Sequence, residues 1–209
     1  MKVAVKIFAP EDEDLENIRE ALLLDNTQRF IKGIELHREL LFFRQNMRLS
    51  EDFHLKLISI FNQYKLDYLI VGGHAVNIHG YLRASDDFDV WLHNTTPNLS
   101  RFRLILKEIG LEKERIYELV HTLARPNDRS VYRFNIEGYN IDFMLALAGI
   151  DDFETTFKNA VYVTIADQKI PFIAIEDLIQ AKKASNRLKD QLDVEMLLKI
   201  QELREDKNN

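Results

Sequence analysis

The stretch from Tyr68 to His93 constrains the fold of this chain more than any other part of its sequence. It begins with a short apolar run that is bulky, partly β-branched and about as long as a buried strand. A Gly72–Gly73 pair follows directly, and two glycines after a strand permit a tight turn and a close approach of the backbone to a ligand. A helix that starts at His74 would point its free N–H groups and its positive dipole end at this turn, where a phosphate can bind.

The same stretch closes on a strand pattern that carries two acidic residues. Asp87 and Asp89 project from one face of this predicted strand. The residues that alternate with them are apolar and can face the core: Phe88, Val90 and Leu92. Neighbouring carboxylates repel each other, and Mg²⁺, which prefers oxygen ligands, removes that repulsion by bridging them. A phosphate-binding turn beside a paired-carboxylate metal site is the equipment of phosphoryl or nucleotidyl transfer.

The string VGGHAVNIHGYLRASDDFDVWL resembles the nucleotidyltransferase superfamily, whose founding fold is that of DNA polymerase beta. The fuller pattern resembles its minimal bacterial branch, which includes the toxin-type nucleotidyltransferases of abortive-infection systems and usually carries Arg-x-Thr-x-Asp-x-Asp. Here Ser85 stands in the place of the threonine and keeps a hydroxyl, and Asp86 adds a charge beside the acidic pair. The string IPFIAIEDLIQAKKASNRLKDQLDVEML also resembles this branch, so the resemblance covers about residues 55–200.

The resemblance implies a third carboxylate on a strand next to the Asp-x-Asp strand, and Asp142 fits that place. From the residues alone, Asp142 is equally well explained as a satisfied polar residue at a strand edge. The resemblance further implies that Asp87 and Asp89 hold two Mg²⁺ ions, with Asp142 on the ion near the attacking oxygen. It assigns the triphosphate of an NTP donor to Gly72, Gly73 and the helix after them.

Further candidates for phosphate contacts lie near the strand and in a later predicted helix. Ser85 either bonds a phosphate oxygen or caps the turn. A lysine on a helix more often lies on a solvated face, but with the resemblance Lys182 or Lys183 becomes a candidate triphosphate contact, and the sequence does not choose between them. Arg187 and Asp190 are three residues apart on one helical face, which predicts an ion pair with a structural role.

Five histidines can be weighed as candidate site residues. His74 and His79 follow the glycines in a predicted short helix, where a single histidine is more often packed or solvent-facing than catalytic. His54, His93 and His121 have no metal-ligand spacing to one another. Arg83 precedes the Asp-x-Asp strand and either holds the loop through contacts to backbone carbonyls or reaches a phosphate; the structural role is the expected one.

The whole pattern predicts an α/β (α+β) fold, in which a small mixed sheet is flanked by helices with extra helices at both ends. Strands are expected over 131–136, 139–147 and 161–165, with 170–175 as an edge segment because Pro171 interrupts it. Residues 1–48, a short strand over 2–8 followed by helices, form an N-terminal helical extension that serves as a cap or as an arm for a protein partner. Residues 49–209 form the nucleotidyltransferase-like domain with its C-terminal helices.

Composition limits the remaining function classes. A net charge of -6 gives no global electrostatic case for nucleic-acid binding, although a local basic patch stays open. The absence of cysteine excludes disulfides and thiolate zinc sites. No apolar run approaches the roughly 20 residues of a membrane span, and no signal-peptide pattern opens the chain, which predicts a cytoplasmic protein.

These features predict Mg²⁺-dependent transfer of a nucleoside monophosphate from an NTP to an acceptor, with release of pyrophosphate. RNA or tRNA, a protein and a small molecule stay open as acceptors, and the sequence does not indicate the oligomeric state. One alternative is a protein that binds a nucleotide or a partner on the same fold without turnover, with Asp86 as a symptom. Another is a toxin–antitoxin component that engages its partner through the N-terminal helices.

Overall fold

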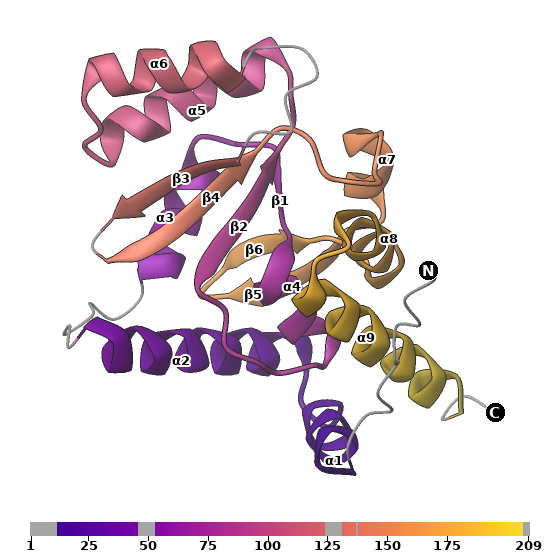
Figure 1. Cartoon of the computed structure of the whole chain (residues 1–209). Helices are drawn as coiled ribbons and strands as arrows, with labels where there is room; N and C mark the ends of the chain where they lie inside the picture. Colours follow the sequence, from indigo (N-terminus) through magenta and orange to yellow (C-terminus); the bar gives the residue numbers. More distant parts are fainter. Residues whose placement is uncertain (1–11, 46–52, 124–130, 137, 207–209) are drawn as a thin grey trace, which may run out of the picture.

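A computed structural model of the chain describes residues 12–45, 53–123, 131–136 and 138–206. A six-stranded mixed sheet with the order β3-β4-β2-β1-β6-β5 runs through its centre (Figure 1). This architecture confirms the predicted α/β class. The strands are β1 (Tyr68–Ile70), β2 (Asp87–Leu92), β3 (Val131–Ile136), β4 (Tyr139–Met144), β5 (Val161–Ile165) and β6 (Gln168–Phe172).

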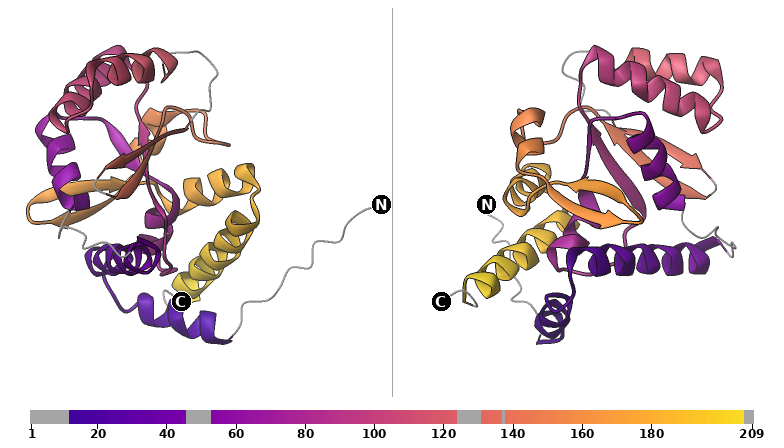
Figure 2. Two further views of the ribbon diagram at one scale, coloured as in Figure 1. Left: turned by 60° about the vertical axis from the view of Figure 1, so that its left-hand side comes forward. Right: turned by 180° about the vertical axis from the view of Figure 1, so that it is seen from behind.

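Helices surround the sheet on both faces and at both ends of its strands (Figures 1 and 2). In Figure 1 the pair α5–α6 lies above the sheet and α2 runs below it, while α8 and α9 pack together at the side. The view from behind brings α3 in front of the sheet (Figure 2). The helices are α1 (Asp12–Ala21), α2 (Asn26–Gln45), α3 (Phe53–Gln63), α4 (Gly72–His79), α5 (Thr96–Glu108), α6 (Lys113–Leu123), α7 (Phe153–Lys158), α8 (Ile175–Ser185) and α9 (Leu188–Asp206).

Strand pairing brings the acidic strands together at the centre of the sheet. Strand β2 pairs antiparallel with β1 and parallel with β4, and Asp89 lies directly opposite Asp142 in the β2–β4 register. Strand β3 pairs antiparallel with β4, which places Arg133 opposite Asp142. The adjacency of the two acidic strands that the resemblance implies is therefore present in the fold.

The expectation of an edge segment around Pro171 is wrong. Strand β6 lies between β1 and β5, so β5 forms this edge of the sheet. The proline is tolerated inside the sheet because β1 is short and pairs with β6 at a single position, where Ile70 lies opposite Phe172. A missing N–H at Pro171 therefore interrupts almost none of the ladder between β1 and β6.

The N-terminal helices pack on the core through α4. Gly33 of α2 approaches α4 so closely that a Cβ at this position would lie 2.6 Å from Nδ2 of Asn77. Arg29 donates from Nη1 to the carbonyl of Ile78 at 2.6 Å and so bonds α2 to the end of α4. Helix α2 is thus part of the packed structure, while the expected strand over 2–8 lies outside the described residues. The division of the chain at residue 48 stays a prediction.

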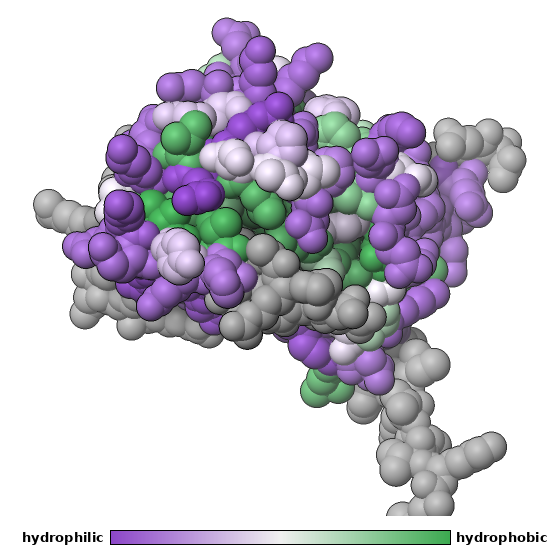
Figure 3. Space-filling view, turned by 90° about the horizontal axis from the view of Figure 1, so that it is seen from above, coloured by the Kyte–Doolittle hydropathy of each residue, from purple (hydrophilic) through white to green (hydrophobic). Residues whose placement is uncertain are grey.

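The interior is a continuous apolar core to which β1 and the apolar side chains of β2 belong. Phe88 and Val90 of β2 are fully buried, as the alternation with the two acidic residues predicts. Seen from above, the surface is mostly hydrophilic, with hydrophobic residues gathered in the middle of this face (Figure 3). Within the part of the chain that the structure describes, no helix combines the length and the apolar character that a membrane span requires.

Candidate active site

The turn after β1 is built around Gly72. The N–H of Val71 donates to the carbonyl of Asp89 at 3.0 Å, which holds the end of β1 against β2. Helix α4 begins at Gly72, two residues before the expected start at His74, and Gly72 has φ +60°. A Cβ on Gly72 would lie 1.9 Å from Oδ2 of Asp89, so only glycine fits this position. The first turn of α4 therefore lies directly on the Asp89 carboxylate.

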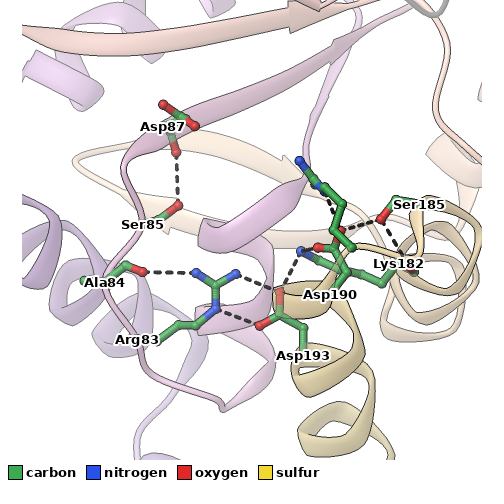
Figure 4. A network of polar contacts seen from close by, with 9 residues as sticks. Arg83, Ala84, Ser85, Asp87, Lys182, Ser185, Asp190 and Asp193 are labelled. Atoms are coloured by element: carbon green, nitrogen blue, oxygen red, sulfur yellow. Dashed lines mark hydrogen bonds and ion pairs between the residues drawn. The ribbon is translucent and has the colours of Figure 1, made fainter. Parts of the chain in front are cut away.

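The second glycine makes a similar close contact with the loop before β2. A Cβ on Gly73 would lie 2.2 Å from Oγ of Ser85, which is itself buried. The Ser85 hydroxyl donates to the carbonyl of Asp87 at 3.3 Å (Figure 4). This hydroxyl therefore bonds the backbone of the turn, and its role as a phosphate contact stays a prediction. Both glycines thus let the turn pack against the Asp-x-Asp strand.

Three carboxylates converge beside this turn. Asp87 and Asp89 project from one face of β2, and Asp142 projects beside them from β4; we call these residues the carboxylate cluster. Burial raises the pKa of Asp89 to about 6, and the negative charges of Asp142 and Asp87 add to the shift. Burial and then the charge of Asp142 also raise the pKa of Asp87. The cluster therefore holds repelling negative charge in a partly desolvated place.

A cation of the protein itself bridges two of these carboxylates. Arg133 donates from Nε to Oδ1 of Asp142 at 2.8 Å and from Nη2 to Oδ2 of Asp142 at 2.8 Å. The same Nη2 also donates to Oδ2 of Asp87 at 2.8 Å. Sequence reasoning missed Arg133. Its signal was a basic residue in a strand expected to form a hairpin with the strand of Asp142, because cross-strand neighbours pair by charge.

The donor set of the carboxylate cluster fits a hard cation. All of its ligand atoms are carboxylate oxygens, which Mg²⁺ prefers. In the described part of the chain, Oδ1 of Asp87 is buried and has no hydrogen-bond partner. Burial and the neighbouring acids raise the pKa of Asp89, so a cation bound beside it would favour its charged form. The residues that would hold Mg²⁺ are thus Asp87, Asp89 and Asp142.

A cavity of about 220 Å³ opens beside the cluster, between the sheet and helices α8 and α9. Gly72, Asp89 and Asp142 line one side of it, and the other side carries the cations Lys182 and Arg187. The complete lining consists of Val71, Gly72, Asp89, Val131, Asp142, Met144, Ala146, Leu147, Ala148, Leu178, Ala181, Lys182, Ser185, Arg187 and Asp190. Carboxylates and cations therefore face the same space, as binding of a metal triphosphate requires.

The structure separates the two candidate lysines. The side chain of Lys182 is only 6% exposed, and its Nζ pairs with Oδ1 of Asp190 and with Oδ2 of Asp193, both at 2.7 Å. Lys183 is exposed and does not line the cavity. Lys182 thus lies at the site, but its ammonium group is engaged by two acids of α9.

This ion-pair network ties the loop before β2 to the C-terminal helices (Figure 4). Arg83 donates from Nε and Nη2 to the two oxygens of Asp193, each at 2.7 Å, and from Nη1 to the carbonyl of Ala84. Asn77 of α4 holds the backbone of Arg83 through two further hydrogen bonds. The structural role expected for Arg83 is confirmed by these contacts, which join α4, the loop and α9.

Asp190 forms the other end of the network. Burial alone would raise the pKa of Asp190, but hydrogen bonds from Lys182, Ser185 and Arg187 outweigh it and lower this pKa to about 2. The bond from Nε of Arg187 to Oδ2 of Asp190 is 2.6 Å long, which confirms the predicted ion pair. The Arg187 side chain remains 65% exposed, so part of its guanidinium is available to a ligand in the cavity.

Lys189 is a further cation that sequence reasoning did not single out. Its positive charge lowers the pKa of both Asp87 and Asp89, so it lies near the carboxylate cluster. Lys189 is exposed, at the start of α9. The signal for it was its place in the C-terminal string that carries the family resemblance.

Comparison with known proteins agrees with this geometry. Residues 51–209 match the model of a family described as "Nucleotidyl transferase of unknown function (DUF2204)". None of the curated proteins matches the chain. The match to the family model supports the superfamily resemblance noted in the sequence.

Two solved structures are similar to the chain at low sequence identity. The lincosamide antibiotic adenylyltransferase LnuA, bound to lincomycin, is 17% identical, with a TM-score of 0.49 over 74% of this chain and 99% of LnuA. ANT(2")-Ia in complex with adenylyl-2"-tobramycin is 15% identical, with a TM-score of 0.47 over 72% and 92% of the two chains. Likeness at this level says nothing about substrates. The match over 51–209 decides the assignment, and the chain belongs to this nucleotidyl transferase family.

Proposed function

We propose that the chain transfers a nucleoside monophosphate from a Mg²⁺-bound NTP to an acceptor hydroxyl or phosphate. The observation that carries this proposal is the register of β2 and β4, which places Asp89 opposite Asp142 beside the Gly72 turn and at the wall of a cavity. A bond forms between the acceptor oxygen and the α-phosphorus. The bond from that phosphorus to the bridging oxygen breaks, and pyrophosphate leaves with its electron pair.

Each part of the site has a role in this proposal. Asp87 and Asp89 would hold Mg²⁺ with Asp142, and bound Mg²⁺ supplies charge neutralisation for the triphosphate and the leaving group. The free N–H groups at the start of α4 are the proposed contacts for phosphate oxygens, because Gly72 lines the cavity beside the carboxylates. Arg187 and Lys189 add positive charge near the leaving group. Asp142 takes the proton of the acceptor hydroxyl once Arg133 has released its carboxylate.

One observation favours the alternative of nucleotide binding without turnover. Arg133 holds both oxygens of Asp142 and one oxygen of Asp87. If this arrangement persists with nucleotide bound, it blocks the oxygens that a catalytic cation needs. Calorimetry with each NTP and Mg²⁺ separates the two functions, because a binding protein gives heat of binding and no pyrophosphate.

The proposal is tested by labelling with each of the four α-labelled NTPs and Mg²⁺, against tRNA, small alcohols, aminoglycosides and protein as acceptors. We expect label transfer by the wild-type chain and a loss of about 1,000-fold or more in Asp87→Asn and Asp89→Asn, because both remove a metal ligand. The matched control is Asp167→Asn in the turn between β5 and β6, where φ is +65° and asparagine is well tolerated. Full labelling by both metal-ligand variants would refute the assignment.

A further inference from the structure

Three histidines from three different helices meet on the face of β2 that is opposite the carboxylates. They are His37 of α2, His54 of α3 and His74 of α4, which we call the histidine cluster; none is more than 1% exposed. Their ring centroids are 5.1 to 5.5 Å apart. Phe88 points away from the carboxylates and packs on two of these rings. The centroid of its ring lies 4.8 Å from that of His54 and 5.2 Å from that of His74. The cluster is therefore separated from the carboxylates by the strand itself.

Five of the six ring nitrogens of this cluster have no hydrogen-bond partner among the residues that the structure describes. Both ring nitrogens of His37, both of His74 and Nε2 of His54 are buried without a hydrogen-bond partner. His79, which shares helix α4 with His74, has the hydrogen-bond partner that a buried histidine normally has: its Nε2 lies 2.8 Å from the carbonyl oxygen of Ile173. A buried polar atom without a hydrogen-bond partner costs free energy. Three adjacent residues with such atoms therefore indicate a binding site for a ligand.

We propose that His37, His54 and His74 form a binding site for one Zn²⁺ ion, distinct from the carboxylate cluster. One nitrogen from each ring lies within 4.8 Å of the other two, so a point within about 2.8 Å of all three exists between them. Zn–N bonds of about 2.0–2.1 Å require each ring to move inward by about 0.7 Å.

The chemistry of the pocket suits zinc. Burial lowers the pKa of His37 to about 4 and of His54 to about 3, so the rings are neutral near pH 7, which is the form that binds metal. The negative charge of Asp86 raises the pKa of His37, and the positive charge of Arg83 lowers the pKa of His74. Imidazole suits Zn²⁺ better than Mg²⁺, and a water molecule completes the four-coordinate set.

The consequence of zinc binding is a link between the N-terminal helices and the catalytic core. His37 lies in α2, outside the residues that the family model matches, whereas His54 and His74 lie inside them. His74 follows two residues after Gly72, in the helix whose first turn lies on Asp89. A zinc ion would therefore fasten α2 to the helix that forms the phosphate-binding turn.

The test measures metal content and spectrum of the full chain after removal of metal with a chelator. We expect wild type and Asp89→Asn to bind one equivalent of Zn²⁺, and His37→Gln and His74→Gln to bind less than about a tenth of that, since one ligand of three is lost. The control is His121→Gln, an exposed histidine of α6, which keeps the full equivalent. Co²⁺ in the same site gives the intense visible bands of a four-coordinate ion with nitrogen ligands.

Thermal melting supplies a second readout. Zn²⁺ at about 100 times its Kd raises the Tm of wild type and of Asp89→Asn by roughly 5–10 °C and leaves that of His37→Gln unchanged. Equal Zn²⁺ binding by His37→Gln, or binding that Asp89→Asn alone abolishes, overturns the proposal. If a glutamine variant does not fold, the Co²⁺ spectrum of wild type decides. Nitrogen-ligated four-coordinate bands support the site, and the weak bands of a six-coordinate oxygen site overturn it.

Discussion

The two faces of β2 carry polar clusters of opposite character. On one face, the carboxylate cluster holds three acids, and burial together with their mutual repulsion raises the pKa of Asp87 and Asp89. On the other face, the histidine cluster holds three neutral rings in an aromatic pocket. The acids have an internal cation, Arg133, whereas five ring nitrogens of the histidines have no described partner.

The comparison shows how one strand–turn–helix unit serves two sites. Gly72 at the start of α4 lies against Asp89, and His74 in the same helix lies against Phe88. Alternation along β2 sends Asp89 and Phe88 to opposite sides. Any change in the position of α4 therefore reaches both clusters, whereas a change confined to one side chain should affect only one of them. The predictions below test this separation.

The largest effect is expected from Gly72→Ala. The new Cβ would lie 1.9 Å from Oδ2 of Asp89 at φ +60°, so both the turn and the carboxylate must shift. We expect nucleotidyl transfer to fall by about 100-fold or more, because small displacements of catalytic groups have large effects. The measurement is label transfer at saturating NTP, with Zn²⁺ content determined on the same sample. If α4 shifts as a body, both readings fall.

Gly110→Ala is the matched control for this change. Gly110 also has a positive φ, +87°, but a Cβ there meets nothing within 4 Å. The variant should lose only about 1–2 kcal/mol of stability and keep its activity, since it carries the backbone strain without the clash. Equal loss of activity in the two glycine variants would show that backbone strain, and not contact with Asp89, explains the effect at the turn.

A second, smaller effect concerns the network beside the carboxylate cluster. Lys182→Met leaves Asp190 and Asp193 without their shared cation in a buried place. Removing one partner of a buried ion pair costs about 3–5 kcal/mol when the charge is left alone. Because Arg187 still pairs with Asp190 and Arg83 with Asp193, the loss should not exceed that range, and denaturant unfolding measures it. Lys183→Met, the exposed neighbour, should change stability by less than about 0.5 kcal/mol. A large loss of stability in the Lys183 variant and none in the Lys182 variant would mean that Lys183, and not Lys182, is the buried partner of these acids.

Locality in the sequence explains what could be foreseen about these sites. The Gly72 turn and the Asp-x-Asp strand lie within one stretch, and alternation alone assigns Asp87 and Asp89 to one face. Asp142 needed the family resemblance, because a single acid in an apolar strand does not reveal which strand lies beside it. The α/β class followed from the order of helical and strand patterns, whereas the interior place of β6 depended on the pairing length of β1.

The histidine cluster had no such local signal. Its members belong to three helices, and metal-binding motifs are recognised by short spacings along one element. From the sequence, His74 fitted the ordinary interpretation of a packed or solvent-facing residue, His54 showed no metal-ligand spacing to His93 or His121, and His37 was not singled out. Arg133 escaped for a related reason, since its partner in the register of β3 and β4 is fixed by a hairpin whose exact pairing the sequence does not state. Contacts between distant elements are thus what only the fold supplies.

A third prediction addresses the charge that distinguishes the two faces. The pKa of Asp89 is raised to about 6 in the folded chain from 3.8, so the native state binds more protons than the unfolded state between these values. Stability of the metal-free protein therefore falls as pH rises from about 4 to 6 and stays low above it. Asp89→Asn should remove this loss and stabilise the metal-free chain at pH 8 by at most about 3 kcal/mol.

Urea unfolding in a chelator at pH 4 and pH 8 measures this difference, with Asp167→Asn as the control in an exposed turn. Addition of Mg²⁺ should reverse the order at pH 8, since the ion stabilises the wild-type chain and binds the variant weakly. A variant that is less stable than wild type at pH 8 in the chelator would mean that the charge of Asp89 is already compensated within the protein.

The smallest effect concerns Arg133, the protein's own cation in the carboxylate cluster. Its guanidinium holds oxygens of Asp87 and Asp142 that would hold Mg²⁺, so cation and side chain compete for the same atoms. Because the Arg133 side chain is 55% exposed, its ion pairs are worth only about 1 kcal/mol, and Arg133→Gln should raise the affinity for Mg²⁺ by about fivefold. Calorimetric titration of the metal-free chain measures this affinity, and Zn²⁺ binding on the other face of β2 should not change. If the affinity for Mg²⁺ falls instead, Arg133 supports the geometry of the carboxylates and does not compete with the ion. In that case the carboxylates of Asp87 and Asp142 would depend on Arg133 for their position, whereas five ring nitrogens of the histidine cluster have no such partner among the described residues.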